Sequence, residues 1–408
     1  MITVDEALSH VLRCARRNAA VRVDLSQAAG RVLAADVQSD VDSPPYDKAM
    51  VDGYAVWSQD LADGHAQLAI LEEVTAGDVP AHGLSSGQAT RIMTGAPLPA
   101  GADAVVMIER TAVVATADNP LGLVIIDDAP PRAGQNVMPR ATVIRRGETI
   151  LCQGTRIGPV EIGLLAEIGA SQVDVFAPPR VAVLATGDEL VPASQMPGAG
   201  QIRNSNGPML LAAVARAGGI PLDLGIGRDD RRQLTELVRR GLESEILILS
   251  GGVSAGVLDL VPEVLAEAGV QQVFHKVRLK PGKPLWFGVL PADPVDKLVF
   301  GLPGNPVSSL VCCELFVRPA IAKMCGRSDV GARCETALLA ADFQHRGDRP
   351  TYHPGRLQAA ENGTIVEPLR WLGSADLRGL AAANALIRFA AGDRRHAAGA
   401  TVDVVRFD

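Results

Sequence analysis

Beginning at residue 180, short apolar runs alternate with longer amphipathic segments, and this alternation restricts the fold more than any other feature of the chain. Near-continuous apolar runs predict buried strands at 180–186, 221–227, 245–250 and 297–302. Amphipathic segments predict helices at 204–219, 230–244 and 259–269. Strands and helices that alternate in this way indicate a doubly wound α/β domain with a parallel sheet. A ligand is expected at the carboxyl ends of its strands.

The composition indicates a globular protein of several domains. The chain has 408 residues, of which 47% are hydrophobic and 21% are charged. A chain of this length suggests about two to four domains. Its net charge of −7 argues against a general nucleic-acid binder, because phosphate backbones favour a basic surface. No apolar run reaches the roughly 18 residues of a membrane-spanning helix, and the first residues lack the pattern of a secretory signal, so a cytoplasmic location is expected.

Two further blocks have the pattern of β structure. Between proline pairs at 44–45 and 130–131, short apolar strands are separated by glycine turns, which predicts an inserted β-rich domain. The last block, from residue 335 onward, predicts a small β barrel or sandwich. The strands expected in these two blocks span 67–74, 102–108 and 121–126, then 335–343, 363–369, 384–390 and 401–407.

Two of the loops that follow the predicted α/β strands contain residues suited to binding an anion. Gly251 and Gly252 can bring backbone N–H groups close to an oxyanion, and Ser254 adds a hydroxyl. A second loop has Asn305 as a helix cap and Pro306 at the first helical position, so its free N–H groups can also bind an anion. The alternative is that both are turns and caps without a ligand. The candidate phosphate-binding residues are Gly251, Gly252, Ser254, Lys283, Pro303, Gly304, Asn305 and Ser308.

Carboxylates also follow the predicted strands, on separate loops. Glu189, either Asp229 or Asp230, and Asp259 could supply oxygen ligands to Mg²⁺ beside a phosphoanhydride. The alternative for any single aspartate is a helix N-cap, so the hypothesis depends on the group.

A row of cations lies in this otherwise acidic chain. Read with a period of two, Lys276, Arg278 and Lys280 fall on one face of a predicted strand, and the apolar residues between them fall on the other. Pro281 and Gly282 end that strand. The row indicates a wall that neutralises phosphate or holds an oxyanion; the alternative is an edge strand protected by lysines.

The ordered set of motifs resembles the molybdopterin molybdenumtransferase family, which includes the gephyrin E domain. The motifs are VDGYAV at 51–56, RIMTGAPLPAGADAVV at 91–106, TGDEL at 186–190, SGGVSAGVLD at 250–259, LKPGKP at 279–284 and LPGNPVSS at 302–309. Together they cover nearly the whole chain.

The resemblance implies a subunit of four parts that forms a homodimer, with each active-site cleft completed by the partner subunit. It also implies an activity in which adenylylated molybdopterin reacts with molybdate, supported by Mg²⁺. The phosphoanhydride is broken, AMP is released and the metal stays on the dithiolene. A molybdopterin adenylyltransferase is the expected pathway partner. The four parts are an elongated N-terminal domain at 1–43 and 135–178, an inserted β-rich domain at 44–134, an α/β domain at 179–327 and a C-terminal β barrel at 328–408.

The resemblance also assigns roles by position. Glu189 and Asp229 would hold the cation, and Lys276 and Lys280 would hold pterin phosphate or molybdate. Asp52 and Thr94 would enter the cleft from the β-rich domain. The candidate catalytic residues are Asp52, Thr94, Asp259, Lys276 and Lys280, and two further binding residues are Arg356 and Ser374. No role falls on Arg278.

The chain departs from the family pattern at two places. Lys48 stands where the family usually has serine, and Val257-Leu258 replaces Glu-Ala before Asp259. Two other functions remain open at this point. One is the preceding adenylylation step, whose enzyme shares the α/β domain, and the other is a gephyrin-like scaffold.

Overall fold

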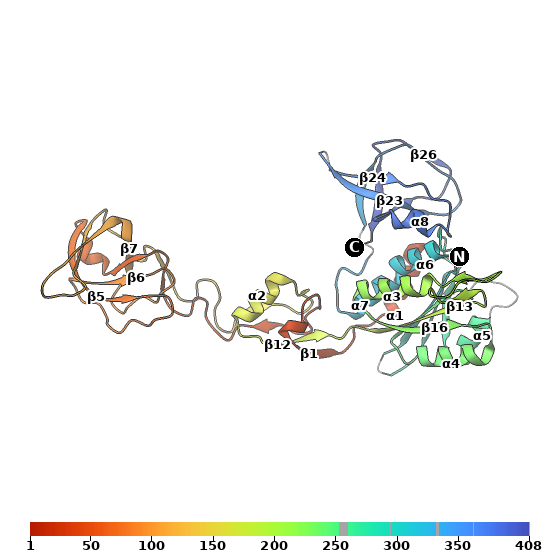
Figure 1. The fold of residues 1–408 in the computed structure, drawn as a ribbon, viewed down its shortest axis with the longest axis horizontal. Coiled ribbons are helices and arrows are strands. Elements are labelled where there is room, and N and C mark those ends of the chain that lie inside the picture. The colour runs from red at the N-terminus through yellow and green to blue at the C-terminus, as the bar shows by residue number, and fades with distance from the viewer. Residues whose placement is uncertain (253–259, 294, 332–333, 362, 408) are drawn as a thin grey trace. The chain divides into compact units, whose positions relative to one another are not determined.

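The computed structural model describes residues 1–252, 260–293, 295–331, 334–361 and 363–407 (Figure 1). The chain folds into two compact units. The first, here called the α/β–barrel unit, comprises Met1–Ala35, Gln153–Gly158 and Gln172–Asp408. The second, the β-rich unit, comprises Asp36–Cys152 and Pro159–Ser171. The four domain boundaries proposed from the sequence stay a prediction.

The α/β–barrel unit contains a six-stranded sheet of order β16-β13-β17-β20-β19-β18. Four strands are parallel: β16 (Ile220–Gly227), β13 (Arg180–Thr186), β17 (Ile246–Ser250) and β20 (Lys297–Leu302). The predicted parallel arrangement is confirmed for these four strands but does not extend to one edge of the sheet. There, β18 (Gln271–His275) and β19 (Trp286–Leu290) run antiparallel, because a loop rather than a crossover helix joins them.

Helices cover both faces of this sheet, which confirms the doubly wound arrangement (Figure 1). Alternate residues of β13 and β17 point to opposite layers. Val181 and Ile248 pack with one set of helices, and Leu184 and Leu247 pack with the other. The first layer contains α1 (Val4–Cys14), α3 (Asn206–Ala217), α6 (Pro306–Cys312) and α7 (Arg318–Met324), and the second contains α4 (Arg231–Gly241) and α5 (Leu260–Glu267).

The N-terminal helix α1 begins directly after its N-cap residue Thr3. Thr3 accepts a hydrogen bond from the backbone nitrogen of Glu6, and the Glu6 carboxylate accepts one from the backbone nitrogen of Thr3. This capping box satisfies two donors that the first helical turn leaves free. Farther along, β1 (Ala20–Asp24) pairs antiparallel with β12 (Gln172–Phe176).

The C-terminal part is a closed barrel of order β21-β24-β23-β25-β27, which confirms the predicted β barrel. One strand, β23, was missed because Pro354 and Gly355 interrupt its apolar pattern. Its neighbours pair with it in spite of that interruption. The barrel strands are β21 (Cys334–Leu339), β23 (Thr351–Ala360), β24 (Gly363–Pro368), β25 (Ala385–Phe389) and β27 (Thr401–Arg406).

The β-rich unit contains a second six-stranded sheet, of order β7-β4-β6-β5-β9-β8. Its core is formed by buried side chains such as Tyr54, Leu61 and Ile126. The helix α2 (Pro159–Glu167) belongs to this unit and begins with proline at its first position. The sheet strands are β4 (Gly53–Val56), β5 (His65–Val74), β6 (Gln88–Ile92), β7 (Ala104–Met107), β8 (Thr111–Val114) and β9 (Leu123–Asp127). In the described part of the chain, no helix is long and apolar enough to span a membrane.

Candidate functional site

A cavity of about 920 Å³ lies at the carboxyl ends of the parallel strands β13, β17 and β20. This is the edge where the strand order predicts a ligand site. Seven of the residues proposed from the sequence line it: Glu189, Asp229, Gly251, Gly252, Pro303, Gly304 and Asn305.

Gly251 and Gly252 follow β17 in a backbone conformation that other residues rarely adopt. Their φ angles are +98° and +62°. A Cβ atom on Gly251 would lie 2.5 Å from the carbonyl oxygen of Thr186, so glycine is required for the close approach of these two loops. The backbone nitrogen of Gly251 donates to Leu302 at 3.1 Å, which extends the β17–β20 pairing by one residue. The turn formed by Gly251 and Gly252 therefore follows the end of the sheet directly and lines the cavity.

The two acidic loops are joined to each other. Arg228 follows β16, and its guanidinium donates to the carbonyl of Asp188 at 2.8 Å. The backbone nitrogen of Asp229 donates to the Asp188 carboxylate at 3.1 Å. The neighbouring Asp230 caps α4 by accepting from Gln233 at 2.7 Å, and it does not line the cavity. Of the two alternatives from the sequence, only Asp229 faces the cavity.

The acidic residues of the cavity suit Mg²⁺, which takes part of its ligands from substrate and water. They suit a metal that is held by protein ligands alone less well. Among the residues that the structure describes, no group of three or more His, Cys, Asp or Glu is arranged to hold a metal ion. The cavity instead offers the carboxylates of Glu189 and Asp229, with room beside them. Mg²⁺ is commonly bound in this way, through one or two carboxylates together with substrate phosphates and water.

The loop at 303–306 carries the second predicted anion site. Asn305 occupies the N-cap position of α6 but makes no capping hydrogen bond through its side chain, and Pro306 is the first helical residue. Ser308 is buried and does not line the cavity. Ser374 reaches this helix through its backbone, since its carbonyl accepts from the nitrogen of Val307 at 3.1 Å.

A buried polar cluster in the wall of the cavity was not predicted from the sequence. The side-chain nitrogen of Asn206 donates to Ser250 Oγ at 2.8 Å and to the carbonyl of Gly304 at 2.7 Å. Ser250 Oγ lies 3.4 Å from Ser309 Oγ. From the sequence, residues 204–206 are expected only to begin a helix. Because residues 204–206 follow the first α/β strand, they too could have been expected near the carboxyl ends of the strands, where a ligand binds.

The predicted strand at 276–280 is absent, and that prediction was wrong. Strand β18 ends at His275, and Lys276 has a φ of +71°, which breaks an extended backbone. The predicted alternation of faces nevertheless holds, because Val277 and Leu279 are buried whereas Arg278 and Lys280 are exposed.

The basic residues lie outside the cavity lining, to which this loop contributes Pro284. Lys280 is bound to the barrel. Its backbone nitrogen donates to Pro350 at 2.9 Å, and its carbonyl accepts from Tyr352 at 2.8 Å. Lys276 and Lys283 also belong to this loop, where the carbonyl of Lys283 accepts from the nitrogen of Val277 at 3.0 Å. Arg278 donates to the carbonyl of Asp348 at 3.3 Å. Arg356 is exposed on β23 and donates to the carbonyl of Ala382 at 3.4 Å.

Asp52 and Thr94 are brought together within the β-rich unit. One carboxylate oxygen of Asp52 accepts from both the backbone nitrogen and the hydroxyl of Thr94. These hydrogen bonds, the backbone one first, lower the pKa of Asp52 below its usual value. Two other candidates, Ser254 and Asp259, lie outside the described residues.

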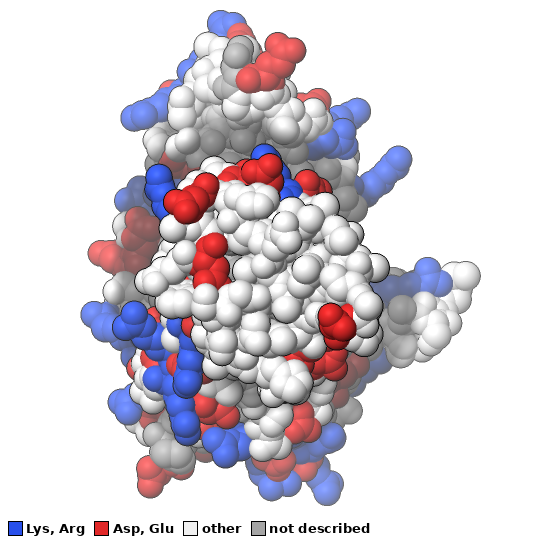
Figure 2. Space-filling model, turned by 90° about the vertical axis from the view of Figure 1, so that its left-hand side faces the viewer, with Lys and Arg blue, Asp and Glu red and all other residues white. Residues whose placement is uncertain are grey.

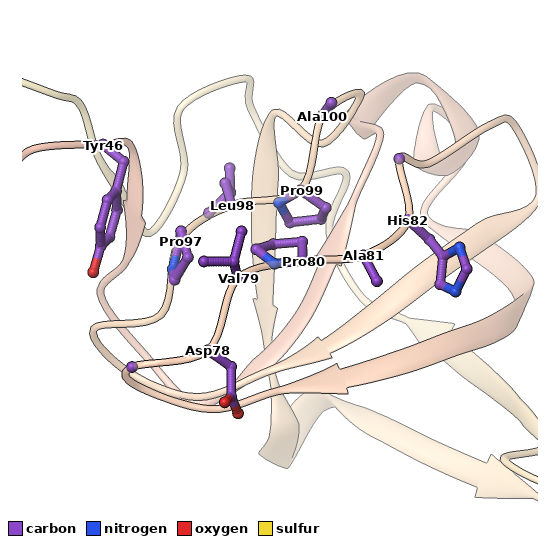
Figure 3. A pocket seen from close by; sticks show the side chains of 12 residues that line it. Tyr46, Asp78, Val79, Pro80, Ala81, His82, Pro97, Leu98, Pro99 and Ala100 are labelled. Atoms are coloured by element: carbon purple, nitrogen blue, oxygen red, sulfur yellow. The ribbon is translucent and has the colours of Figure 1, made fainter.

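The β-rich unit also has a groove of its own, with a volume of about 390 Å³ (Figure 3). Tyr46, Val79, Pro80, Pro97 and Leu98 are among its lining residues, so the groove is mainly apolar. The end of this unit that faces the viewer in Figure 2 is mostly uncharged, and the charged side chains on it are mainly acidic.

Three family models match consecutive parts of the chain. They are described as the MoeA N-terminal region (domain I and II), at residues 2–169, a probable molybdopterin binding domain, at 182–323, and the MoeA C-terminal region (domain IV), at 336–407. Together they account for both units.

Complete relatives and solved structures agree with these matches. A molybdopterin molybdenumtransferase from Staphylococcus aureus is 32% identical over 99% of this chain and 95% of its own, and one from Nostoc is 36% identical over 83% and 77%. A crystal structure of the molybdopterin biosynthesis MoeA protein from Pyrococcus horikoshii superimposes with a TM-score of 0.85 at 30% identity, covering 100% of this chain and 99% of that one. The chain therefore belongs to the molybdopterin molybdenumtransferase family.

Proposed function

We propose that this protein is a molybdopterin molybdenumtransferase, which inserts molybdate into adenylylated molybdopterin and releases AMP. The substrate carries a phosphoanhydride, so the site must hold several phosphate oxygens and the cation that accompanies them. The observation that supports this most directly is the single cavity on which two glycines of positive φ, the 303–306 loop and two carboxylates from separate loops converge.

In this proposal the loops bind the phosphates. Backbone N–H groups at Gly251, Gly252 and the start of α6 would face phosphate oxygens, since glycine turns and helix starts present such donors. Ser254 would add a hydroxyl. These contacts would orient the phosphoanhydride without a covalent bond to the protein.

Glu189 and Asp229 would hold Mg²⁺ in the same cavity. When bound, the cation supplies positive charge that stabilises the phosphate oxygens as the anhydride breaks. Asp259 is assigned to the same catalytic group by the family motif in which it stands.

Lys276, Lys280 and Lys283 are proposed to neutralise the pterin phosphate or the incoming molybdate, with Arg356 and Ser374 as further contacts. The hydrogen bonds that join Lys280 to β23 would keep this basic loop in a fixed conformation. A lysine can hold the oxyanion because its side chain places a compact positive charge next to it.

Asp52 and Thr94 are proposed to complete the cleft in a homodimer. The two hydrogen bonds that Thr94 donates hold the ionised carboxylate of Asp52 on the surface of the β-rich unit. The adenylylated substrate must come from an enzyme that adenylylates molybdopterin, so a molybdopterin adenylyltransferase is the proposed pathway partner.

Purified protein, supplied with adenylylated molybdopterin, molybdate and Mg²⁺, should release AMP and yield a cofactor that activates a cofactor-free molybdoenzyme. Omitting molybdate should abolish the activation. Absence of both AMP release and activation would refute the proposed function. ATP consumption on molybdopterin alone would indicate the adenylylation step instead.

A further inference from the structure

We infer that Asn206 is a positioning residue for the proposed reaction, because its amide fixes the 303–306 loop against the end of β17. The inference rests on the proposed function and assigns a role to a residue that the family motifs leave without one. Asn206 is the first residue of α3 and is only 8% exposed, although it lines the cavity. The helix itself is anchored in the core by Leu210 and Val214.

The geometry accounts for the need for an amide at this position. The strands β17 and β20 pair as far as Ser250 and Leu302, and the nitrogen of Gly251 donates one further bond to the carbonyl of Leu302. Beyond that point, Asn206 supplies the next connection, by donating to both Ser250 Oγ and the Gly304 carbonyl. The two loops proposed to bind phosphate thereby keep a fixed separation.

The orientation of the amide follows from chemistry. The Gly304 carbonyl can only accept a hydrogen bond, so the amide nitrogen of Asn206 must face it at 2.7 Å. A carboxylate of the same shape would place an oxygen against that carbonyl and repel it. Aspartate at this position is therefore a sharper test than alanine, although it changes the volume less.

The test compares Asn206→Asp and Asn206→Ala with the unmodified protein. AMP binding is measured by calorimetry, AMP release gives KM and kcat, and thermal melting reports stability. Leaving a buried carbonyl without its partner predicts a roughly tenfold rise in the Kd for AMP and in KM for Asn206→Ala, with a larger rise for Asn206→Asp. Lowering the pH should partly restore Asn206→Asp, because a protonated carboxyl can donate to Gly304, whereas Asn206→Ala should not recover.

Asn384→Ala is the matched control. Its side chain also makes two hydrogen bonds to backbone, both with Leu357, at 2.7 and 3.0 Å, and it does not line the cavity. It should leave AMP affinity unchanged. Wild-type AMP affinity and KM in both Asn206 variants would overturn the inference. So would a loss of AMP affinity in Asn384→Ala that matched the loss in Asn206→Ala, since that would reflect general destabilisation.

The proposed function and this inference fail in different ways. If the unmodified protein binds AMP but releases none from adenylylated molybdopterin, the proposed function is wrong while the binding comparison still decides the role of Asn206. If the unmodified protein turns over and both Asn206 variants match it, only the role of Asn206 is wrong.

Discussion

One carboxylate oxygen of Asp52 accepts two hydrogen bonds from Thr94, from its backbone nitrogen and from its hydroxyl, each 2.7 Å long. The two residues are distant in sequence, and their contact lowers the pKa of the Asp52 carboxyl. Because the folded-state pKa is lowered, the ionised carboxylate favours the folded state above the unfolded pKa. That contribution is lost as the pH falls through the folded value.

Thr94→Val removes one of these bonds and leaves the backbone bond in place. We expect the pKa of Asp52 to rise toward its usual value without reaching it, as followed by carboxyl carbon NMR during an acid titration. Thr75→Val is the control, since the Thr75 hydroxyl bonds Asp78 at 2.7 Å in the same unit. An unchanged Asp52 titration in Thr94→Val would show that the hydroxyl has no influence.

The adjacent residues Asp229 and Asp230 allow a test of the metal site. Asp229 lines the cavity, whereas Asp230 caps α4. Asp229→Asn should raise the Mg²⁺ concentration for half-maximal AMP release roughly tenfold or more, because it removes a charged ligand. Glu189→Gln should do the same.

Asp230→Ala should instead cost about 1 kcal/mol of unfolding free energy, through loss of the cap, and leave the Mg²⁺ requirement unchanged. Urea unfolding and a Mg²⁺ titration of AMP release distinguish the two effects. A Mg²⁺ requirement that moved in Asp230→Ala and not in Asp229→Asn would reverse the assignment.

The sequence predicted the positions of the buried strands well, but it did not predict the backbone conformation of the loops. Apolar runs such as 246–250 are buried on both faces, so their pattern alone located them and the loops that follow. The backbone at Lys276 could not be foreseen, because nothing in a lysine indicates a positive φ. Asp52 and Thr94 were proposed for the same cleft, but their hydrogen bonds to each other were not foreseen, because these depend on the pairing of β4 with β6. Asn206 was missed because its two partners lie on other segments.

Two glycines of the β-rich unit should respond oppositely to the same substitution. A Cβ on Gly53 would lie 1.9 Å from the carbonyl oxygen of Val106, in the neighbouring strand β7. Gly53→Ala must therefore push these strands apart, and we expect a loss of about 1–3 kcal/mol or more in unfolding free energy.

Gly163 lies inside α2, and an added Cβ there would meet no atom within 4 Å. Gly163→Ala should stabilise the unit by about 0.5–1 kcal/mol, because alanine loses less backbone entropy in a helix. Thermal unfolding of both variants checks the pair. Equal effects of the two substitutions would contradict the close contact at Gly53.

His353 should make the stability of the barrel depend on pH. Its ring is only slightly exposed, lies 5.5 Å from Trp371, and has Nε2 2.8 Å from the carbonyl oxygen of Leu369. Burial, followed by the nearby charge of Lys280, lowers the pKa of His353 below its usual value, although the bond to Leu369 opposes this. The unfolded chain therefore takes up a proton first as the pH falls.

The contribution of His353 to stability is complete above the unfolded pKa of about 6.5 and decreases as the pH falls below it. One such group changes the unfolding free energy by at most about 1.4 kcal/mol per pH unit. Urea midpoints measured between pH 7.5 and 5 should fall less steeply in His353→Gln than in the unmodified protein. Identical slopes in the two proteins would contradict the lowered pKa.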